Sequence, residues 1–328
     1  MSAGRSSDQP PLISTGKSVA IMADRGAERA IDGGGAAGIL KRLVADPPVA
    51  PYSRCLGRYD FDGWVWLCPP IRPYVVCASA RSGSTWLCEE LSWRDLAQPI
   101  EYLNPAYVEY LAWRWGSANL AQYRMMLWKY RTNADGVFGI KVLGMHFFDL
   151  QAEHFSSLLD GDLPADPELR RLAYFDAFVP GCTFVWLRRR DMVGQAVSWW
   201  LAEQTGAWVQ VTDDDRRDLS SVDYDGAAID YKLRSVRRED EQWERFFTRT
   251  GIEPRCVEYE ELQEFPERVI GDLAVSLGGH RTPAGVLPER HNRLQRNDLT
   301  DVLVNRYRLE LASQQVGHGT GDTGISTV

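Results

Sequence analysis

The chain has 328 residues, of which 44% are hydrophobic and 25% are charged, and its formal net charge is −8. This balance is that of a soluble protein with one large α/β domain and extensions, and the negative charge argues against a general nucleic-acid binder, whose surface must neutralise phosphates. No stretch approaches the roughly 20 apolar residues that span a bilayer, and residues 1–18 lack the apolar core of a signal peptide, so we expect a cytoplasmic protein without a transmembrane segment.

The two ends of the chain differ in composition from its middle. Residues 1–50 are rich in Gly, Ala, Ser and Pro, which predicts a largely disordered N-terminal extension. Residues 313–328 have little to bury and are expected to form a flexible tail, which leaves 51–312 as the folded domain. The six cysteines are scattered and form no Cys-x-x-Cys pair. We therefore expect buried, reduced thiols and no metal site.

Within the domain, short apolar runs alternate with helical segments. The expected strands are residues 74–78 (YVVCA), 137–143 (VFGIKVL), 183–187 (TFVWL) and 255–259 (RCVEY). The expected helices begin near Ser84 and cover 191–203, 231–250 and 265–277. Strands separated by helices imply a parallel sheet with right-handed crossovers. The fold class is therefore α/β, a P-loop-like parallel β-sheet flanked by helices, with ligands beyond the carboxyl ends of the strands.

The segment directly after the first strand predicts an anion site. It reads Ala80, Arg81, Ser82, Gly83, Ser84, Thr85, Trp86. A short Gly/Ser turn that feeds a helix presents unpaired backbone N–H groups and the positive end of the helix dipole, and phosphate is the usual occupant. Gly83 lets the backbone come close, and Arg81 adds a fixed charge. The alternative is an ordinary helix N-cap made by Ser82 or Ser84.

This loop departs from the phosphate loop of kinases and ATPases. That motif places a lysine and a Ser/Thr after its last glycine, for the phosphates and for magnesium. Here no lysine follows Gly83, and the cation, Arg81, precedes it. A P-loop-like nucleotide kinase and a non-catalytic nucleotide-binding protein are the two alternatives to the function considered below.

A second anion contact is predicted after the strand at residues 183–187. Three arginines, Arg188, Arg189 and Arg190, follow it, and Ser198 lies eight residues past Arg190, roughly two helical turns on. Arginines at the end of a buried strand are costly unless an anion or an acid meets them. The alternative is a solvated basic strand end.

Taken together, these motifs resemble the sulfotransferases that use 3′-phosphoadenosine 5′-phosphosulfate (PAPS). The loop resembles their 5′-phosphosulfate loop, and Arg190 with Ser198 resembles the pair that holds the 3′-phosphate. The segments 138–141 (FGIK), 204–208 (QTGAW) and 294–298 (LQRND) narrow the resemblance to the bacterial trehalose 2-sulfotransferase family, over residues 73 to 310.

The resemblance implies the sulfotransferase fold, PAPS as co-substrate, no metal, a homodimer, and a small acceptor with a hydroxyl group. That acceptor would be a carbohydrate, a glycolipid or a glycosylated natural product. It also implies that the nucleotide is bound by Arg81, Ser82, Gly83, Ser84, Thr85, Trp86, Arg190, Ser198 and Arg296. At the last position the chain reads Arg-Asn where Arg-Gln is commoner in the family.

The family uses a carboxylate base in a Pro-x-Glu-aromatic segment, and residues 99–102 (PIEY) match it. Glu101 is therefore the expected base for the acceptor hydroxyl, with His146 as the competing candidate. Lys141 lies inside an apolar strand, where burial is expensive without a partner. It either pairs with an acid or meets the sulfuryl oxygens as charge shifts to the leaving phosphate. Glu101, Arg81 and Lys141 are the predicted catalytic residues.

Overall fold

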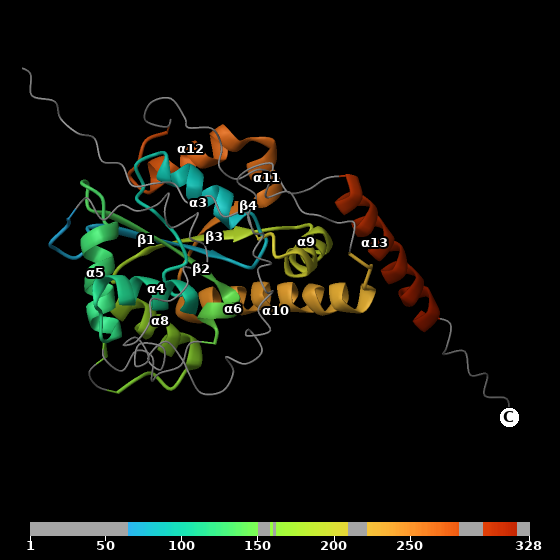
Figure 1. Cartoon of the computed structure of the whole chain (residues 1–328), viewed down its shortest axis with the longest axis horizontal. Coiled ribbons are helices and arrows are strands. Elements are labelled where there is room, and N and C mark those ends of the chain that lie inside the picture. The colour runs from blue at the N-terminus through green and yellow to red at the C-terminus, as the bar shows by residue number, and fades with distance from the viewer. Residues whose placement is uncertain (1–64, 150–157, 160–161, 209–221, 282–297, 320–328) are drawn as a thin grey trace, which may run out of the picture.

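The structure is a computed structural model that describes residues 65–149, 158–159, 162–208, 222–281 and 298–319. Figure 1 shows a central sheet with helices on both of its faces. The elements in chain order are β1 (Arg72–Ala78), α3 (Ser84–Ser92), α4 (Pro105–Trp115), α5 (Leu120–Arg131), β2 (Val137–Leu143), α6 (Gly144–Phe147), α8 (Pro167–Phe178), β3 (Thr183–Arg188), α9 (Met192–Thr205), α10 (Gly226–Thr250), β4 (Arg255–Glu258), α11 (Tyr259–Glu264), α12 (Pro266–Ser276) and α13 (Asp298–Gly319).

The described strands form one four-stranded sheet in the order β2-β1-β3-β4. All three pairings are parallel. Ala78 at the end of β1 is in register with Leu143 of β2 and Leu187 of β3. The carboxyl ends of the strands therefore meet at one edge of the sheet, which is where ligands bind in folds of this kind. The predicted α/β fold is confirmed.

Each face of the sheet has its own apolar core. Alternate residues of a strand point to opposite faces, and in β1 Val75 and Cys77 pack in one cluster while Tyr74 and Val76 pack in the other. The first cluster joins the sheet to α4, α5, α8 and the C-terminal part of α10. The second joins it to α3, α11 and α12, which lie together above the sheet in Figure 1.

The predicted element boundaries hold within a few residues, with one larger difference. The strand at Val137–Leu143 has the predicted bounds. The long helix α10, however, begins at Gly226, not at Tyr231. The reason is Asp225, whose side chain accepts a hydrogen bond from the backbone N–H of Ala228 and so caps the helix earlier in the chain.

The domain boundaries stay predictions. The extension proposed for residues 1–50 lies outside the described residues, and so do residues 320–328. Helix α13 continues to Gly319, across the boundary placed at residue 312.

The prediction of buried thiols is right in part. Cys77 and Cys88 are buried, but Cys68 and Cys256 are exposed free thiols. Cys68 lies between Leu67 and Pro69, and Cys256 precedes Val257, yet both cysteines lie at the margins of the fold, one before β1 and one on the short edge strand β4. Local apolarity therefore overstated their burial.

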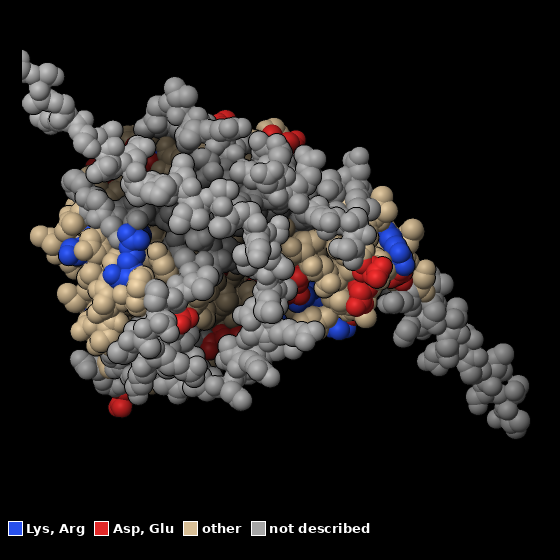
Figure 2. All heavy atoms as spheres, viewed as in Figure 1, with Lys and Arg blue, Asp and Glu red and all other residues tan. Residues whose placement is uncertain are grey.

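The outer surface gives two further observations. On the face shown in Figure 2, the described Lys and Arg side chains lie in separate groups over α5, α10 and α13 and form no continuous basic area. In the part of the chain that the structure describes, no helix has the length and apolar character needed to cross a bilayer.

Candidate active site

The loop between β1 and α3 leaves the start of α3 without a side-chain cap. The N-cap residue is Gly83, with φ 94°, and no side chain accepts a hydrogen bond from the first turn. The alternative of a cap made by Ser82 or Ser84 is therefore not what the structure has. A Cβ on Gly83 would lie 2.5 Å from ring atoms of Tyr259, so both the backbone angle and the close ring require glycine. The uncapped N–H groups leave a place for an anion.

Arg81 and Ser198, which lie far apart in the sequence, meet at this loop. Arg81 has a positive φ of 62°. Its Nε donates to Ser198 Oγ at 3.2 Å, and its guanidinium also donates to the carbonyl of Trp208. The neighbouring Ser82 is fully buried, and its hydroxyl has no hydrogen-bond partner among the described residues. The two predicted anion motifs thus share one location.

Of the three consecutive arginines, the one nearest the loop is Arg189. Its side chain is 9% exposed, it donates to the carbonyl of Arg81 at 3.2 Å, and its guanidinium lies 4.7 Å from the ring centre of Tyr259. Arg189 therefore holds the backbone of the loop at Arg81. This role was not predicted from the sequence. Arg188 forms an ion pair of 2.8 Å with Asp240.

Arg190, the predicted 3′-phosphate ligand, points elsewhere. Its side chain is 70% exposed, and its Nε lies 3.5 Å from a carboxylate oxygen of Glu260. No hydrogen bond or ion pair joins Arg190 to Ser198 in the described part of the chain. Since the side chain is long and exposed, it can turn toward a ligand, but the structure does not bring this predicted pair together.

Lys141 connects the loop to the predicted base. Its Nζ lies 2.8 Å from Glu101 Oε1 and donates to Thr85 Oγ1 at 3.0 Å. In β2, Lys141 has the same parity as Val137, which packs in the core cluster beneath α3, and this explains why its side chain reaches α3. Lys141 thus pairs with an acid, as one of the two readings of its burial required.

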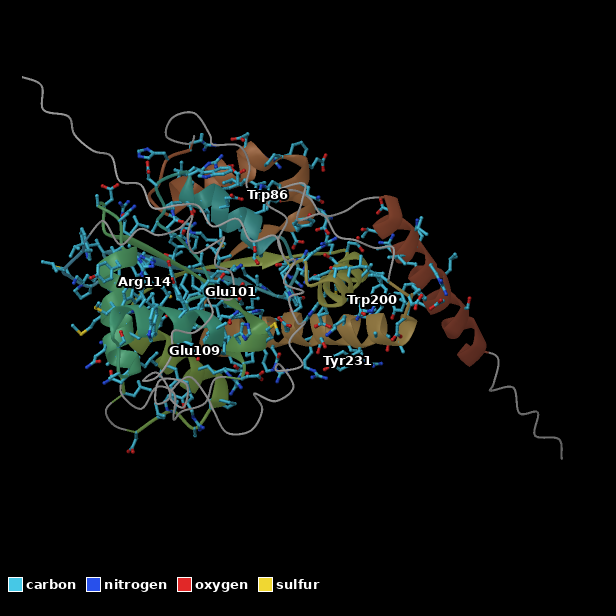
Figure 3. All side chains as sticks on the ribbon, viewed as in Figure 1. Trp86, Glu101, Glu109, Arg114, Trp200 and Tyr231 are labelled. Atoms are coloured by element: carbon cyan, nitrogen blue, oxygen red, sulfur yellow. The ribbon has the colours of Figure 1, made fainter. Side chains whose placement is uncertain are left out.

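Glu101 is placed by backbone pairing as well as by charge. Ile100 forms a bridge with Ile140, and its carbonyl accepts from the backbone N–H of Lys141 at 3.0 Å, so the next residue lies beside that lysine. The second oxygen of Glu101 accepts from Asn104 Nδ2 at 3.0 Å. Figure 3 shows Glu101 near the middle of the molecule, between α3 and α4.

The electrostatics keep Glu101 ionised. Burial by itself would raise the pKa of Glu101, but the charge of Lys141, with smaller contributions from His146 and Asn104, lowers it below the usual value. His146 Nε2 lies 3.9 Å from Glu101 Oε2. Burial lowers the pKa of His146, against the opposing pull of Glu101. Both candidate bases are therefore unprotonated at neutral pH, and both lie at the same end of the sheet.

Of the remaining predicted residues, the structure describes Trp86 but not Arg296. Trp86 lies on α3, where its ring meets Tyr259 edge-on at 6.4 Å and its Nε1 donates to Glu90 at 3.3 Å. Arg296 lies outside the described residues. The sequence also passed over the role of Gln195, whose Nε2 donates to Ser79 Oγ at 2.7 Å and to the Ala80 carbonyl at 2.6 Å. The signal was a glutamine within a helix of mostly apolar residues.

These groups form a basic site in an acidic protein. Arg81, Arg189 and Lys141 surround a helix start that lacks a cap, and an ionised carboxylate lies on the far side of the lysine. Such an arrangement can bind an anionic group, and the carboxylate can take the proton of a hydroxyl that attacks that group.

Comparison with known proteins supports a single family. Residues 73–310 match the family described as Stf0 sulphotransferase. The chain is 28% identical to trehalose 2-sulfotransferase of Mycobacterium tuberculosis strain Erdman in an alignment 267 residues long that covers 73% of this chain and 96% of that protein. It is 33% identical to trehalose 2-sulfotransferase of Mycolicibacterium smegmatis over 122 residues, which are 37% of this chain and 44% of that protein.

Proposed function

The chain belongs to the Stf0 sulphotransferase family, and we propose that it transfers a sulfuryl group from PAPS to a hydroxyl group of a carbohydrate-containing small molecule. The nucleotide's 5′-phosphosulfate would bind at the uncapped start of α3, with Arg81, Ser82, Thr85 and the backbone at Gly83. Its 3′-phosphate would bind between Ser198 and the arginines that follow β3, with Arg296 as a further contact.

One observation carries this proposal. The Nζ of Lys141 lies between a carboxylate oxygen of Glu101, at 2.8 Å, and the hydroxyl of Thr85 in the anion loop, at 3.0 Å. The candidate base Glu101, the cation of Lys141 and the anion loop are therefore in contact one after another. This succession is what in-line transfer of an anionic group to a hydroxyl requires.

The proposed step balances as follows. The acceptor O–H gives its proton to the Glu101 carboxylate while its oxygen forms a bond to sulfur. The bond from sulfur to the bridging phosphate oxygen breaks, and the electron pair stays on the leaving nucleotide, 3′-phosphoadenosine 5′-phosphate (PAP). Lys141 and Arg81 offset the negative charge that grows on the leaving phosphate. The charge on the lysine also keeps Glu101 ready to accept a proton, since it lowers the pKa of that carboxyl.

The acceptor is proposed from the relatives. Both are named for sulfation of trehalose, and a carbohydrate hydroxyl suits a site whose base is a carboxylate. A homodimer and a cytoplasmic location remain predictions. The family match favours sulfuryl transfer over a nucleotide kinase, whereas a non-catalytic nucleotide-binding protein is separated from an enzyme only by a turnover assay.

Nucleotide binding and turnover test the proposal in turn. With no metal present, PAP should raise the melting temperature of the protein more than ADP does, because only PAP carries the 3′-phosphate and binding to the native state stabilises it. Purified protein with ³⁵S-labelled PAPS should then label trehalose or another disaccharide. Equal stabilisation by ADP and PAP contradicts the assigned 3′-phosphate site, and PAP binding without label transfer to any of a panel of sugars and glycolipids points to the non-catalytic alternative.

A further inference from the structure

Gln195 of α9 binds the first residues of the anion loop. Its Nε2 donates to Ser79 Oγ at 2.7 Å and to the Ala80 carbonyl at 2.6 Å. Gln195 is 1% exposed, and Ser79 and Ala80 are buried as well. Water therefore cannot replace either bond, and a buried carbonyl without a donor is costly. One buried amide thus ties the loop after β1 to a helix that lies more than a hundred residues further along the chain.

The same face of α9 makes two further contacts with the loop. Ser198 and Trp199 follow Gln195 by three and four residues, so their side chains lie on the same side of the helix. Ser198 Oγ accepts from Arg81 Nε at 3.2 Å, and Trp199 belongs to the same apolar cluster as Ala80. About one turn of α9 therefore sets the position of three consecutive loop residues.

The loop needs such support because its backbone is strained. Arg81 has a φ of 62°, in the left-handed region, and a residue other than glycine keeps that conformation only where its surroundings hold it. The carbonyl of Ala80, just before it, is held by Gln195, and the carbonyl of Arg81 itself accepts from Arg189. Because a trans peptide points its C=O and its N–H in opposite directions, the bond from Gln195 also fixes the direction of the Arg81 N–H.

The spacing between the loop and α9 matters for a ligand with two phosphates. In the proposed function the 5′ end of the nucleotide binds at the loop and its 3′-phosphate binds beside Ser198. The nucleotide itself sets the separation of these two groups, so the protein binds both only if the loop and α9 already lie at the matching separation. Gln195 joins these two parts of the site.

We propose that Gln195 is a positioning residue, which holds the anion loop at the distance from Ser198 that lets one nucleotide place its 5′ and 3′ phosphates together. The proposal rests on the proposed function, since it concerns the same donor. Gln195 contacts neither phosphate in this scheme and acts only through Ser79 and the Ala80 carbonyl.

The test compares PAP with adenosine 5′-monophosphate (AMP), which lacks the 3′-phosphate, by calorimetry on the full chain. Gln195→Met keeps the length of the side chain and removes both donated bonds. Trp243 of α10 still donates to the Ala78 carbonyl at 3.2 Å in this variant, so the start of the loop stays held. We expect PAP affinity to fall about tenfold and AMP affinity by about twofold or less, because AMP can follow a displaced loop and PAP cannot.

Gln204→Met is the matched control, since it is the same change at an exposed position of the same helix, and it should bind both nucleotides as the wild type does. Ser79→Ala approaches the contact from the loop and leaves α9 unchanged. It removes one of the two acceptors, so the preference for PAP over AMP should fall about threefold, and it decides the matter if Gln195→Met does not fold.

The outcomes separate this inference from the function on which it rests. A wild-type preference for PAP over AMP in both Gln195→Met and Ser79→Ala overturns the positioning role alone. An equal fall in the affinities for PAP and AMP also overturns it, since a general loosening of the loop affects both nucleotides alike. A wild-type chain that does not bind PAP, or that binds AMP equally well, overturns the proposed function itself.

Discussion

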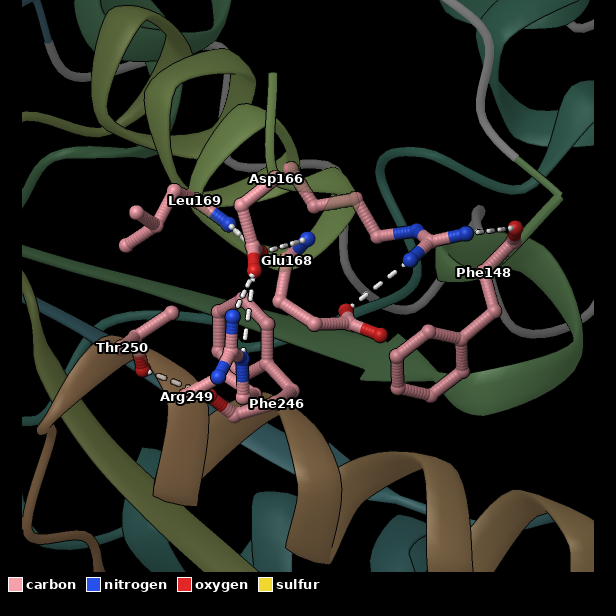
Figure 4. Close-up of polar contacts among 8 residues, drawn as sticks. Phe148, Asp166, Glu168, Leu169, Phe246, Arg249 and Thr250 are labelled. Carbon is pink, nitrogen blue, oxygen red and sulfur yellow. Dashed lines mark hydrogen bonds and ion pairs between the residues drawn. The ribbon is translucent and has the colours of Figure 1, made fainter. Parts of the chain in front are cut away.

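Helices α8 and α3 begin in different ways. At α8 the N-cap is Asp166, whose Oδ1 accepts from the backbone N–H groups of Glu168 at 2.8 Å and of Leu169 at 3.1 Å. Figure 4 shows this carboxylate also bonded to Arg249 at the end of α10. At α3 the N-cap is Gly83, and no side-chain cap accepts a hydrogen bond from the backbone N–H groups at the start of the helix.

The difference separates a structural helix start from a binding one. The chain itself supplies the anion at α8, so the dipole and the free N–H groups of that helix are satisfied before any ligand arrives. At α3 the same groups are left open, and the nearby cations are Arg81 of the preceding loop, Arg189 after β3 and Lys141 of β2. Where a protein leaves a helix start uncapped inside a basic site, an anionic ligand is the natural partner.

The largest expected effect concerns the proton acceptor beside the open helix start. Glu101→Gln keeps the shape of the side chain but cannot take a proton, so kcat should fall by about a hundredfold to ten-thousandfold. PAP affinity should stay near that of the wild type, because the carboxylate faces the acceptor. Steady-state kinetics with labelled PAPS measure the first quantity and calorimetry the second.

His146→Asn distinguishes the two candidate bases and should lower kcat much less. If instead Glu101→Gln stays active and His146→Asn is inactive, the base is the histidine. The pH–rate profile adds a check. Because the pKa of Glu101 is lowered by Lys141, against its own burial, activity should persist below the usual range of a glutamate and be lost only as the pH falls through the lowered pKa.

The next largest expected effect is the loss of PAP affinity when arginines near the uncapped start of α3 are removed. Arg81→Ala deletes a charged donor to phosphate, and such bonds are worth about 1.5–3 kcal/mol, so PAP affinity should fall about tenfold to a hundredfold while the fold persists. Arg189→Ala should also weaken binding, through its bond to the Arg81 carbonyl. Arg190→Ala tests the original prediction for the 3′-phosphate, and wild-type affinity in Arg190→Ala together with a loss in Arg189→Ala would move that role by one residue.

The stabilising contributions of two carboxylates, the buried Glu239 of α10 and the capping residue Asp166 of α8, should depend on pH in opposite directions. The pKa of Glu239 is raised to about 7 by burial, whereas an unfolded glutamate titrates near ~4.3. Folding therefore takes up a proton, and its stabilising effect is present below the unfolded pKa and is lost as the pH rises through 7. Between pH 5 and pH 8 the free energy of unfolding of the wild type should fall by about 2–3 kcal/mol relative to Glu239→Gln. A constant difference over this range, measured in urea, would contradict the raised pKa.

The smallest expected effect is at the capped helix. The hydrogen bond from Arg249, with those from Leu169 and Glu168, lowers the pKa of Asp166, so its contribution is present above the unfolded pKa and is lost as the pH falls through the lowered one. Asp166→Ala removes the cap and should lower the melting temperature by about 2–4 °C at neutral pH, with PAP affinity unchanged. Asp166→Asn keeps a capping oxygen and should lose less. A clear fall in PAP affinity in Asp166→Ala would contradict the assignment of a purely structural role to the start of α8 and of ligand binding to the start of α3.

Much of the fold could be predicted because it depends on local patterns. The apolar runs predicted the four strands that the structure describes, and the Gly/Ser turn with the helix after it marked the edge of the sheet where we place the site. The burial of Lys141 inside an apolar strand predicted a partner, and the structure supplies one in Glu101. The start of α10 was placed too late because the cap signal at Asp225 was overlooked.

The sequence by itself determined the order of strand, loop and helix and the kinds of side chain at each end, since the periods of helices and strands and the chemistry of loops are local properties. Only the tertiary structure decided which of these side chains meet. Arg189 and Arg190 are neighbours just past the end of β3, yet the path of the chain brings Arg189 to the loop and leaves the side chain of Arg190 in solvent. In the same way, nothing in the local sequence of α10 indicates that Trp243 donates to the Ala78 carbonyl at the end of β1, because that contact depends on how distant elements pack.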